Sequence, residues 1–458
     1  MLRSSCISNL LIQETEAMKN ILKYSILTVL GIIALSGCKK LDEVNTNPNN
    51  PLSATPATQF LSSELLIGYA MGGDMSRFTS LWDQQVIGVG RQAQSYNAYV
   101  VGNADFDAPW GNLYQGMTNL NDMIITAQKA GNIRYVGVAK ILMAYTLGMS
   151  SDVWNGMPYS KAFQGVNDLQ PAFDNQQALY ATMHQLCDDG IAALANPAPG
   201  KLVPGTDDLI YGGDAAKWTA FAHGLKAKFY LHTSKVNAGD LAKVLTEVTA
   251  ASGFADAYVT FGTANNTAGP WFQFLQQRAG DIQFTQSTLG NMLITTSDPR
   301  LAAYIDTTHN VLGSFYGGVS SPAQLMTAAE LDFIQAEASY RSSDHATAAT
   351  MSNTGALASV LAITGGAAPA GWTTTYASET GSSITLEKIM TQKYIALFLN
   401  PESFSDWRRT GFPTLVQTPG SSTTGIPRRF FYAETETERN ANTPRNVQLT
   451  DRVWWDVP

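Results

Sequence analysis

Apolar residues recur at three- and four-residue steps along most of this 458-residue chain, and this periodicity is what most limits its fold. The clearest case is a stripe of large apolar residues formed by Trp110, Leu113, Tyr114, Met117, Leu120 and Ile124. This spacing puts the side chains on one face of a helix, whereas a half-buried strand would alternate at every second residue. Gly131 follows as a stop signal. The sequence therefore predicts a helix here and a mostly helical protein.

The same spacing predicts further helices over residues 58–70, 135–147, 174–194, 214–232, 240–251, 327–340, 346–363 and 386–400. Asp174, with Gln177 three residues later, resembles a capping box, and Asp214 is expected to cap the helix that follows it. The helices come in successive pairs, although no repeat of about 34 residues is visible. We therefore predict a mostly α fold, in which tetratricopeptide-like helix pairs form an α-solenoid scaffold with long irregular loops and few short strands.

Long segments rich in Gly, Ser, Thr and Asn separate the predicted helices at residues 253–270, 306–322, 365–383 and 417–445. Loops of this length in a compact protein usually have a function or are disordered. Many aromatic residues lie in these segments. The loop aromatics are therefore candidates for ligand contact.

The N-terminal residues resemble an export signal. Two lysines precede the apolar run 26–35, and Ser36 and Gly37 stand directly before Cys38. This order is typical of a bacterial lipoprotein signal, in which the chain is cut before a cysteine that is then acylated. A membrane-spanning or buried core helix is the alternative, but a spanning helix needs about 20 apolar residues and this run is shorter.

These features predict the boundaries of the chain. Residues 1–37 form the signal peptide region, with Met18 as the expected true start and cleavage before Cys38. Acyl chains such as palmitate on Cys38 then anchor the protein to a membrane that it does not span. Residues 38–56 form the lipidated N-terminus and a flexible Asn/Pro-rich tether, and residues 57–458 form the helical domain.

Composition and missing motifs exclude several classes of function. A net charge of -8 without a basic run argues against nucleic-acid binding. The glycine-rich nucleotide signatures, the H-E-x-x-H zinc motif and the G-x-S-x-G nucleophile motif are absent. Cys6 lies before the expected start and Cys38 is the acylation site, so Cys187 is the one remaining thiol and no disulfide is expected.

Two groups of residues have the chemistry of metal ligands. His184 and Cys187 fall on one helical face, three residues apart, and could bind a metal together with Asp188, but two neighbours on one face of an aliphatic helix are more commonly core residues. Loop carboxylates at Asp207, Asp208 and Asp256 could ligate calcium, although they lack the D-x-[DN]-x-[DN]-G pattern. We therefore expect no cofactor and leave a structural calcium ion open.

Carboxylate pairs are the feature that would support glycoside hydrolysis, which places two Asp or Glu residues across the scissile bond. The pairs in the sequence are Asp105 with Asp107, Asp207 with Asp208, and Glu330 with Glu337. Helix capping, loop solvation or an arginine partner explains each pair more simply. We therefore predict a protein that is not an enzyme, with a surface glycoside hydrolase as one alternative and a structural or adhesive lipoprotein as another.

Aromatic side chains give a stronger indication of ligand binding, because a flat ring offers an apolar face to sugar C–H groups or to apolar side chains. We predict a ligand site from six aromatic residues and one neighbouring arginine: Trp82, Arg91, Tyr96, Trp271, Phe272, Tyr316 and Trp372. The alternative for each ring is that it pins a long loop to the core.

The order of several motifs resembles the SusD/RagB family of nutrient-binding outer-membrane lipoproteins of Bacteroidetes. The motifs are the lipoprotein signal with its Asn/Pro tether, the helix with Trp110 and Tyr114, DVWNGMPY at 152–159, AAELDFIQAEA at 328–338, QKYIALF at 392–398 and DWRRTG at 406–411. No single motif is decisive, but together they cover nearly the whole mature chain.

The resemblance implies a surface-exposed, lipid-anchored outer-membrane protein. Such a protein binds an oligosaccharide or peptide and delivers it, as a lid, to a SusC-like TonB-dependent transporter without covalent chemistry. The matching motifs belong to the scaffold, where Glu330, Glu337, Arg408 and Arg409 are expected to form buried or half-buried ion pairs between helices. The binding residues do not follow from these motifs.

Overall fold

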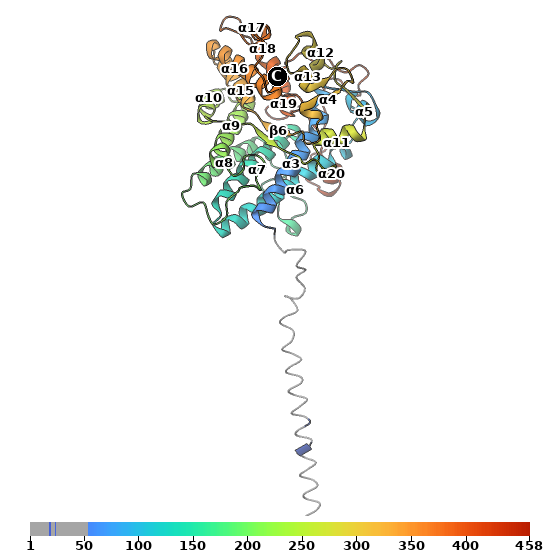
Figure 1. Cartoon of the computed structure of the whole chain (residues 1–458). Helices are drawn as coiled ribbons and strands as arrows, with labels where there is room; N and C mark the ends of the chain where they lie inside the picture. Colours follow the sequence, from blue (N-terminus) through green and yellow to red (C-terminus); the bar gives the residue numbers. More distant parts are fainter. Residues whose placement is uncertain (1–17, 20–22, 24–53) are drawn as a thin grey trace, which may run out of the picture. The chain divides into compact units, whose positions relative to one another are not determined.

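The computed structural model describes residues 18–19, 23 and 54–458 (Figure 1). The predicted cleavage site, Cys38 and nearly all of the tether lie outside the described residues. Residues 56–458 form one compact unit. Within the described part of the chain, no helix combines the length and apolar character needed to cross a bilayer.

The helices before residue 260 are α3 (Pro56–Ala70), the π-helix η2 (Met71–Met75), α4 (Ser76–Trp82), α5 (Arg91–Asn97), the 3-10 helix η3 (Asn103–Phe106), α6 (Asp107–Ala130), α7 (Ile133–Trp154), the 3-10 helix η4 (Gly165–Asn167), α8 (Gln176–Leu194), α9 (Ala215–Thr233) and α10 (Asp240–Ala250). The later helices are α11 (Pro270–Gln277), α12 (Thr288–Thr295), α13 (Leu301–Tyr304), α14 (Ser314–Gly317), α15 (Ala328–Arg341), α16 (His345–Thr364), α17 (Ala370–Tyr376), α18 (Leu386–Ala396), α19 (Glu402–Thr410) and α20 (Glu434–Arg439).

The described strands are short and form three antiparallel two-stranded ladders. They are β1 (Ile87–Gly88) with β3 (Ile282–Gln283), β2 (Ala257–Val259) with β6 (Ala323–Met326), and β4 (Ile305–Asp306) with β5 (Val311–Leu312). Each ladder joins a loop segment to another part of the chain or closes a hairpin. The mostly helical fold with few short strands is therefore confirmed.

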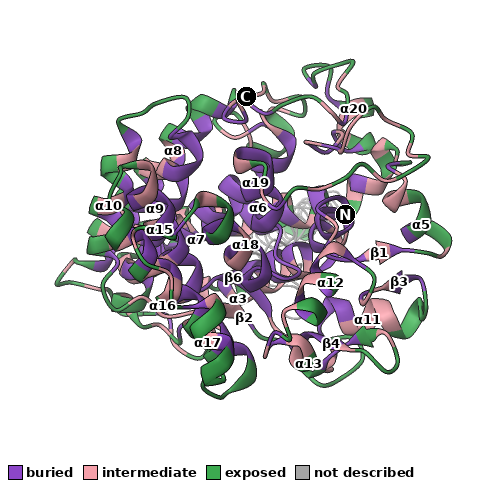
Figure 2. Cartoon of the chain, turned by 90° about the horizontal axis from the view of Figure 1, so that it is seen from above, coloured by how far each residue is buried: buried purple, intermediate pink, exposed green. Residues whose placement is uncertain are grey.

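Long helices pack as antiparallel neighbours in chain order, from α6 against α7 and α7 against α8 to α9 against α10 and α15 against α16. Glycine permits the closest approach between α7 and α8. A Cβ atom at Gly190 would lie 2.5 Å from Cγ1 of Ile141 and 3.0 Å from the carbonyl oxygen of Gly137. Figure 2 shows α7, α9 and α15 as largely buried, whereas α10 and α16 lie toward the edge and expose much of their length.

Most predicted helix ends are close to the observed ones, and Asp214 caps α9 as expected, with Oδ1 accepting from the backbone N–H of Ala216 at 2.9 Å. The prediction for α8 was wrong by one residue. Asn175 is the cap, because its Oδ1 accepts from Ala178 N at 2.9 Å, whereas Asp174 accepts from the backbone of Tyr159. The helix expected over 386–400 ends earlier, at residue 396.

Buried ion pairs tie the scaffold helices together. Arg409 of α19 forms a bidentate bond with Glu337 of α15, and its Nη2 also lies 2.6 Å from Oδ1 of Asp406. Lys228 of α9 lies 2.6 Å from Glu330 of α15. Burial alone would raise the pKa of Glu337, but Arg409 and Arg341 lower it to about 2. The predicted pairing is therefore confirmed for Glu330, Glu337 and Arg409.

Arg408 does not form a carboxylate pair, so the prediction for this residue was wrong. Its Nη1 donates to the carbonyl oxygens of Asp152 and Arg428, both at 2.7 Å. The guanidinium also lies over the rings of Phe404 and Trp455, at 4.3 and 4.8 Å from their centroids. Carbonyl groups and aromatic faces stabilise this buried charge.

Candidate functional site

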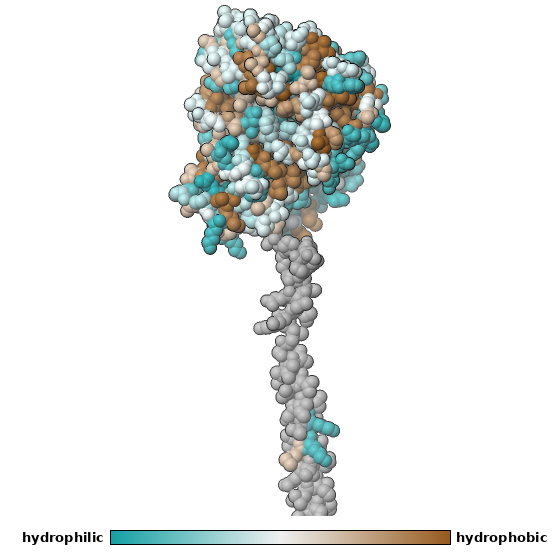
Figure 3. All heavy atoms as spheres, viewed as in Figure 1, coloured by the Kyte–Doolittle hydropathy of each residue, from teal (hydrophilic) through white to brown (hydrophobic). Residues whose placement is uncertain are grey.

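Three hollows lie next to one another along one face of the molecule, and most of their lining comes from residues 270–318. Their volumes are about 910, 390 and 170 Å³. Leu312 and Gly317 line both the first and the second, and Ile282 lines both the second and the third. We call this continuous surface the loop face. Figure 3 shows apolar and polar groups interspersed where α11, α12 and α13 reach the surface.

Local sequence signals explain why these residues form short elements rather than long helices. Pro270 begins α11, and Ser287 caps α12 by accepting from Gly290 N at 2.9 Å. Asn310 has a φ of 55° in the turn between β4 and β5, a conformation that asparagine tolerates. Its Oδ1 accepts from the backbone N–H groups of Phe284 and Thr285, which fixes the hairpin against the segment after β3.

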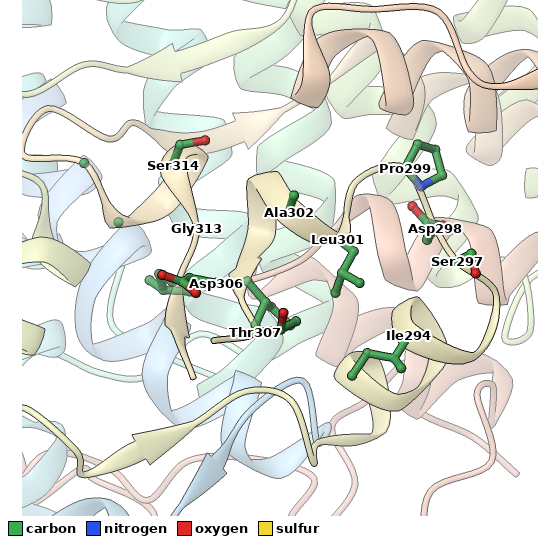
Figure 4. Close-up of a pocket in the computed structure, with 14 residues that line it drawn as sticks. Ile294, Ser297, Asp298, Pro299, Leu301, Ala302, Asp306, Thr307, Gly313 and Ser314 are labelled. Carbon is green, nitrogen blue, oxygen red and sulfur yellow. The ribbon is translucent and has the colours of Figure 1, made fainter. Parts of the chain in front are cut away.

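The first hollow has apolar walls and a few polar groups (Figure 4). Ile294 and Leu301 lie on one side, and Asp306 and Ser314 lie on the other. Asp298 also lines the hollow, and the buried Arg300 donates to it from Nε to Oδ1 at 2.9 Å and from Nη2 to Oδ2 at 2.7 Å. A buried ion pair therefore holds one part of the wall in place.

The second hollow combines one aromatic ring with amides and an imidazole. Phe272 and Gln276 come from α11, Gln283 comes from β3, and His309 comes from the β4–β5 turn. The side-chain amides of Gln276 and Gln283 have no hydrogen-bond partner among the described residues, and Phe272 is only half-buried. His309 Nδ1 donates to Oδ2 of Asp306 at 2.7 Å, a bond that lowers the pKa of Asp306. Free amides beside a ring edge or face suit a ligand with many hydroxyl groups.

Carboxylates and guanidinium groups of opposite charge line the third hollow: Asp74, Asp105 and Asp281 with Arg77 and Arg278. Asp74 of the π-helix η2 pairs with Arg77, whose guanidinium lies 4.7 Å from the centroid of Phe274. Gly73 has φ and ψ of -110°, which distorts the helix beside these two residues. The Tyr96 hydroxyl donates to Asp105 at 2.6 Å; burial and this bond raise the pKa of Tyr96. Short π-helical segments often occur at functional sites.

The structure brings three of the seven predicted site residues to the loop face. Phe272 lines the second hollow and Tyr96 lines the third. Arg91 lies at the rim, where its side chain is 59% exposed and its Nη2 lies 2.8 Å from Asp281. Their role in binding stays a prediction.

The other four predicted site residues are buried: Trp82, Trp271, Tyr316 and Trp372 are 0, 4, 4 and 6% exposed. Burial argues against the prediction that these rings stack on a ligand. They fit the alternative, because they fasten loop segments to the scaffold.

Two of these rings show how the fastening works. Trp271 donates from Nε1 to Ser76 Oγ at 2.9 Å, and Tyr316 packs edge-on against Phe398 with the ring centroids 5.6 Å apart. Both bring the loop-face segment onto helices or loops of the core. The buried rings therefore position the loop face without forming its surface.

Gln276, Gln283 and His309 were missed in the sequence analysis. Each is an ordinary polar residue in a short element, and they come together only through the β1–β3 pairing and the β4–β5 hairpin. The one local signal was that His309 and Asn310 fall within a predicted long loop.

The residues considered as metal ligands bond to or pack against other side chains and backbone groups in the described part of the chain. Cys187 is fully buried, and burial raises the pKa of its thiol, while the ring of His184 stacks on Tyr230 at 3.9 Å. The carboxylate of Asp208 accepts from Trp218 Nε1 at 2.7 Å and from three backbone N–H groups. Asp256 accepts from Ala328 N at 2.7 Å. Calcium binding at these carboxylates stays an open prediction.

Among the described residues, Asp152, His232 and Glu402 form the one group of three side chains close enough to share a metal ion. His232 Nε2 lies 2.6 Å from Glu402, and its Nδ1 lies 3.3 Å from Asp152. Burial would lower the pKa of His232, but the charges of Glu402 and Asp152 raise it to about 9. The ring is therefore an imidazolium at neutral pH, and this group fits an ion network better than a metal site.

The carboxylate pairs considered for hydrolysis also have local partners. Asp105 accepts from Gly102 N at 2.8 Å, and Asp107 accepts from Thr435 N at 3.0 Å. Asp207 accepts from the Tyr135 hydroxyl at 2.9 Å. Asp105 has a capping role of the kind that the simpler explanation predicted, whereas Asp107 and Asp207 bond to residues that are distant in the sequence.

Solved structures share this fold across most of the chain. A SusD/RagB family protein from Bacteroides thetaiotaomicron is 22% identical with a TM-score of 0.70, covering 88% of this chain and 99% of its own. A chitin-binding SusD homologue from Flavobacterium johnsoniae is 20% identical with a TM-score of 0.74, covering 88% and 98%. A SusD homologue from Bacteroides uniformis is 19% identical with a TM-score of 0.71, covering 88% and 99%. At this identity, the likeness shows the fold alone.

Comparison with curated proteins finds no match. A family model matches residues 48–433, which is most of the chain, and its description is "Starch-binding associating with outer membrane". Together with the paired-helix scaffold, this match means that the chain belongs to the SusD-like family.

Proposed function

We propose that this protein binds a neutral oligosaccharide on the loop face, as a cell-surface lipoprotein anchored through Cys38. The continuity of the three hollows carries the proposal, because a chain of sugar rings needs an extended site rather than one deep pocket. A glycan rather than a peptide is favoured by the description of the family as starch-binding and by the chitin-binding homologue.

The second hollow is the centre of the proposed site. Phe272 offers its ring to the C–H groups of a sugar, and the free amides of Gln276 and Gln283 bind hydroxyl groups nearby. The apolar cleft with Ile294 and Leu301 accepts further rings on one side. Charges of opposite sign balance at the third hollow, because Arg77, Arg278 and the neighbouring Arg91 match Asp74, Asp105 and Asp281, so this end favours no net charge on the ligand.

The protein acts without covalent chemistry and delivers the glycan, as a lid, to a SusC-like TonB-dependent transporter. The family's association with the outer membrane supports this partnership. Affinity purification from native outer membranes tests it. Co-purification of a TonB-dependent barrel is expected, and purification of the lipoprotein alone would contradict the partnership.

Calorimetric titration of the Cys38→Ser chain with chitohexaose, maltohexaose, cellohexaose and a neutral hexapeptide tests binding. We expect saturable binding of a glycan, weakened at least about tenfold by joint Gln276→Ala and Gln283→Ala substitution. Leu361→Ala is the control, because Leu361 is an exposed apolar residue on α16, outside the loop face.

Mass analysis of the same mixtures separates the proposal from its alternatives. Recovery of every bound ligand intact is expected. Cleaved products would show the glycoside hydrolase instead. Binding of the peptide alone would overturn the ligand class, and failure of every probe to bind would favour a structural or adhesive role.

A further inference from the structure

A separate hollow of about 340 Å³ lies on the helix-pair scaffold, formed by α8, the end of α9, the start of α10 and the C-terminal segment. It shares no lining residue with the loop face. Figures 1 and 2 both place α8, α9 and α10 on the side of the molecule away from α11. A ligand in this hollow would therefore bind independently of one on the loop face.

Four aromatic side chains line this hollow: Tyr180, His184, Tyr230 and Trp454. Tyr230 has both ring faces covered, one by His184 at 3.9 Å and the other by the ammonium group of Lys243 at 4.9 Å. Trp454 is half-buried and touches Tyr180 edge-on, with the ring centroids 5.9 Å apart. Trp454 is therefore the ring with surface left for a ligand, and Tyr230 forms a rigid wall.

The backbone holds Trp454 in place. Its N–H donates to Oε1 of Gln176 at 2.8 Å and to Oδ1 of Asn155 at 3.1 Å. The next residue, Trp455, is fully buried and donates from Nε1 to Asp152 at 2.8 Å. An indole fixed at the surface loses little conformational entropy when a ligand stacks on it.

The polar groups of the hollow divide into paired charges and free neutral groups. Lys243 lies 2.8 Å from Asp240, which also accepts from Thr233, so these charges cancel. The Tyr230 hydroxyl, the Trp454 indole N–H and the Gln177 amide have no hydrogen-bond partner among the described residues. Free neutral groups around an aromatic surface match an uncharged ligand with several hydroxyl groups.

We propose that this hollow is an accessory site for one or two neutral sugar rings, stacked on Trp454 and hydrogen-bonded by Gln177 and Tyr230. The volume lies at the small end of ligand pockets, which suits a short piece of glycan rather than a long chain. The inference takes its ligand class from the proposed function but concerns a different site. A second contact of this kind would let the protein hold one polymer at two points.

Calorimetry tests the inference by measuring how many molecules of chitohexaose or maltohexaose bind to the Cys38→Ser chain. For a hexamer that binds, we expect two sites on the unchanged chain. Trp454→Ala and Gln177→Ala should each weaken one site, by about tenfold and about threefold, and leave the other unchanged. In a Phe272→Ala background, the loop-face site should weaken while the accessory site keeps its affinity, and adding Trp454→Ala should then weaken the accessory site about tenfold.

Gln177 is exposed, so its substitution tests the site even if Trp454→Ala fails to fold. Gln185→Ala, on α8 outside the hollow, is the matched control. One site that responds to Phe272→Ala but not to Gln177→Ala would overturn the accessory site and leave the proposed function standing. No binding of either hexamer would overturn both.

Discussion

The scaffold and the loop face use polar side chains in opposite ways. In the scaffold, Glu337, Arg409 and Asp406 are buried and bonded to one another across α15 and α19. On the loop face, the amides of Gln276 and Gln283 reach the surface without a partner in the described residues. Satisfied groups fix one arrangement of helices, whereas unsatisfied groups are available to a ligand. Substitutions in the two regions should therefore affect different measurements.

The largest expected effect is on stability, from Arg409→Met. This change leaves Glu337 buried without its bidentate partner, so the free energy of unfolding should fall by about 3–5 kcal/mol. Urea unfolding followed by circular dichroism measures it. Lys388→Gln is the control, because Lys388 is 47% exposed and its pair with Glu379 should therefore contribute less than about 1 kcal/mol. Equal losses in the two variants would remove the distinction between buried and exposed pairs.

A pH-dependent loss of stability should follow from His232. Its pKa is about 9, above the ordinary value of 6.5, so its stabilisation is fully present below about pH 6.5. That stabilisation is lost as the pH rises through about 9, and the free energy of unfolding should fall by about 2–4 kcal/mol over this window.

The contribution of His232 is isolated by comparison with His232→Gln. Burial raises the pKa of Asp83 to about 8, which produces a slope of the same sign between about pH 4 and 8 in both proteins. The diagnostic quantity is therefore the loss of unfolding free energy between pH 6.5 and pH 9.5, which should be larger in the unchanged protein than in His232→Gln. Parallel profiles would show that His232 is not charged in the folded protein.

A smaller effect, on affinity rather than stability, is expected for Phe272→Ala. The ring is half-buried, so its removal should lower glycan affinity about tenfold and change the free energy of unfolding by only about 1 kcal/mol. Calorimetry and urea unfolding of the same preparation measure both. If stability falls while affinity is unchanged, Phe272 belongs with the fastening rings.

The smallest effect is expected for Arg91→Gln. Its guanidinium pairs with Asp281 but remains 59% exposed, so water and salt screen the charge. Glycan affinity should change by less than about threefold. Titrations at low and high salt check this, and a loss of tenfold or more would place Arg91 in direct contact with the ligand.

The sequence predicted the scaffold well because helical periodicity and capping are local. Asp214 caps α9 because it stands directly before the first residue of that helix. The stripe from Trp110 to Ile124 becomes one face of α6. Ion pairs between helices were expected for Glu337 and Arg409 from the motifs that contain them rather than from spacing. The error at Asp174 was one residue, since Asn175 has the same capping chemistry.

The loop face was harder to predict because its residues meet only in three dimensions. Trp271 and Phe272 are adjacent in the sequence, yet one is buried against Ser76 and the other lines a hollow. Local sequence does not distinguish them, since both lie in the first turn of α11 directly after Gly269 and Pro270. Gln283 reaches the site through its pairing with Ile87, which no pattern in the letters indicates.

Hydrogen exchange of the Cys38→Ser chain with and without a saturating glycan hexamer tests most directly whether the loop face binds glycans. The account predicts slowed exchange in residues 270–283 and 305–318, with the buried helices α7 and α15 unchanged. Slowed exchange confined to other parts of the chain, with the loop face unaffected, would contradict it.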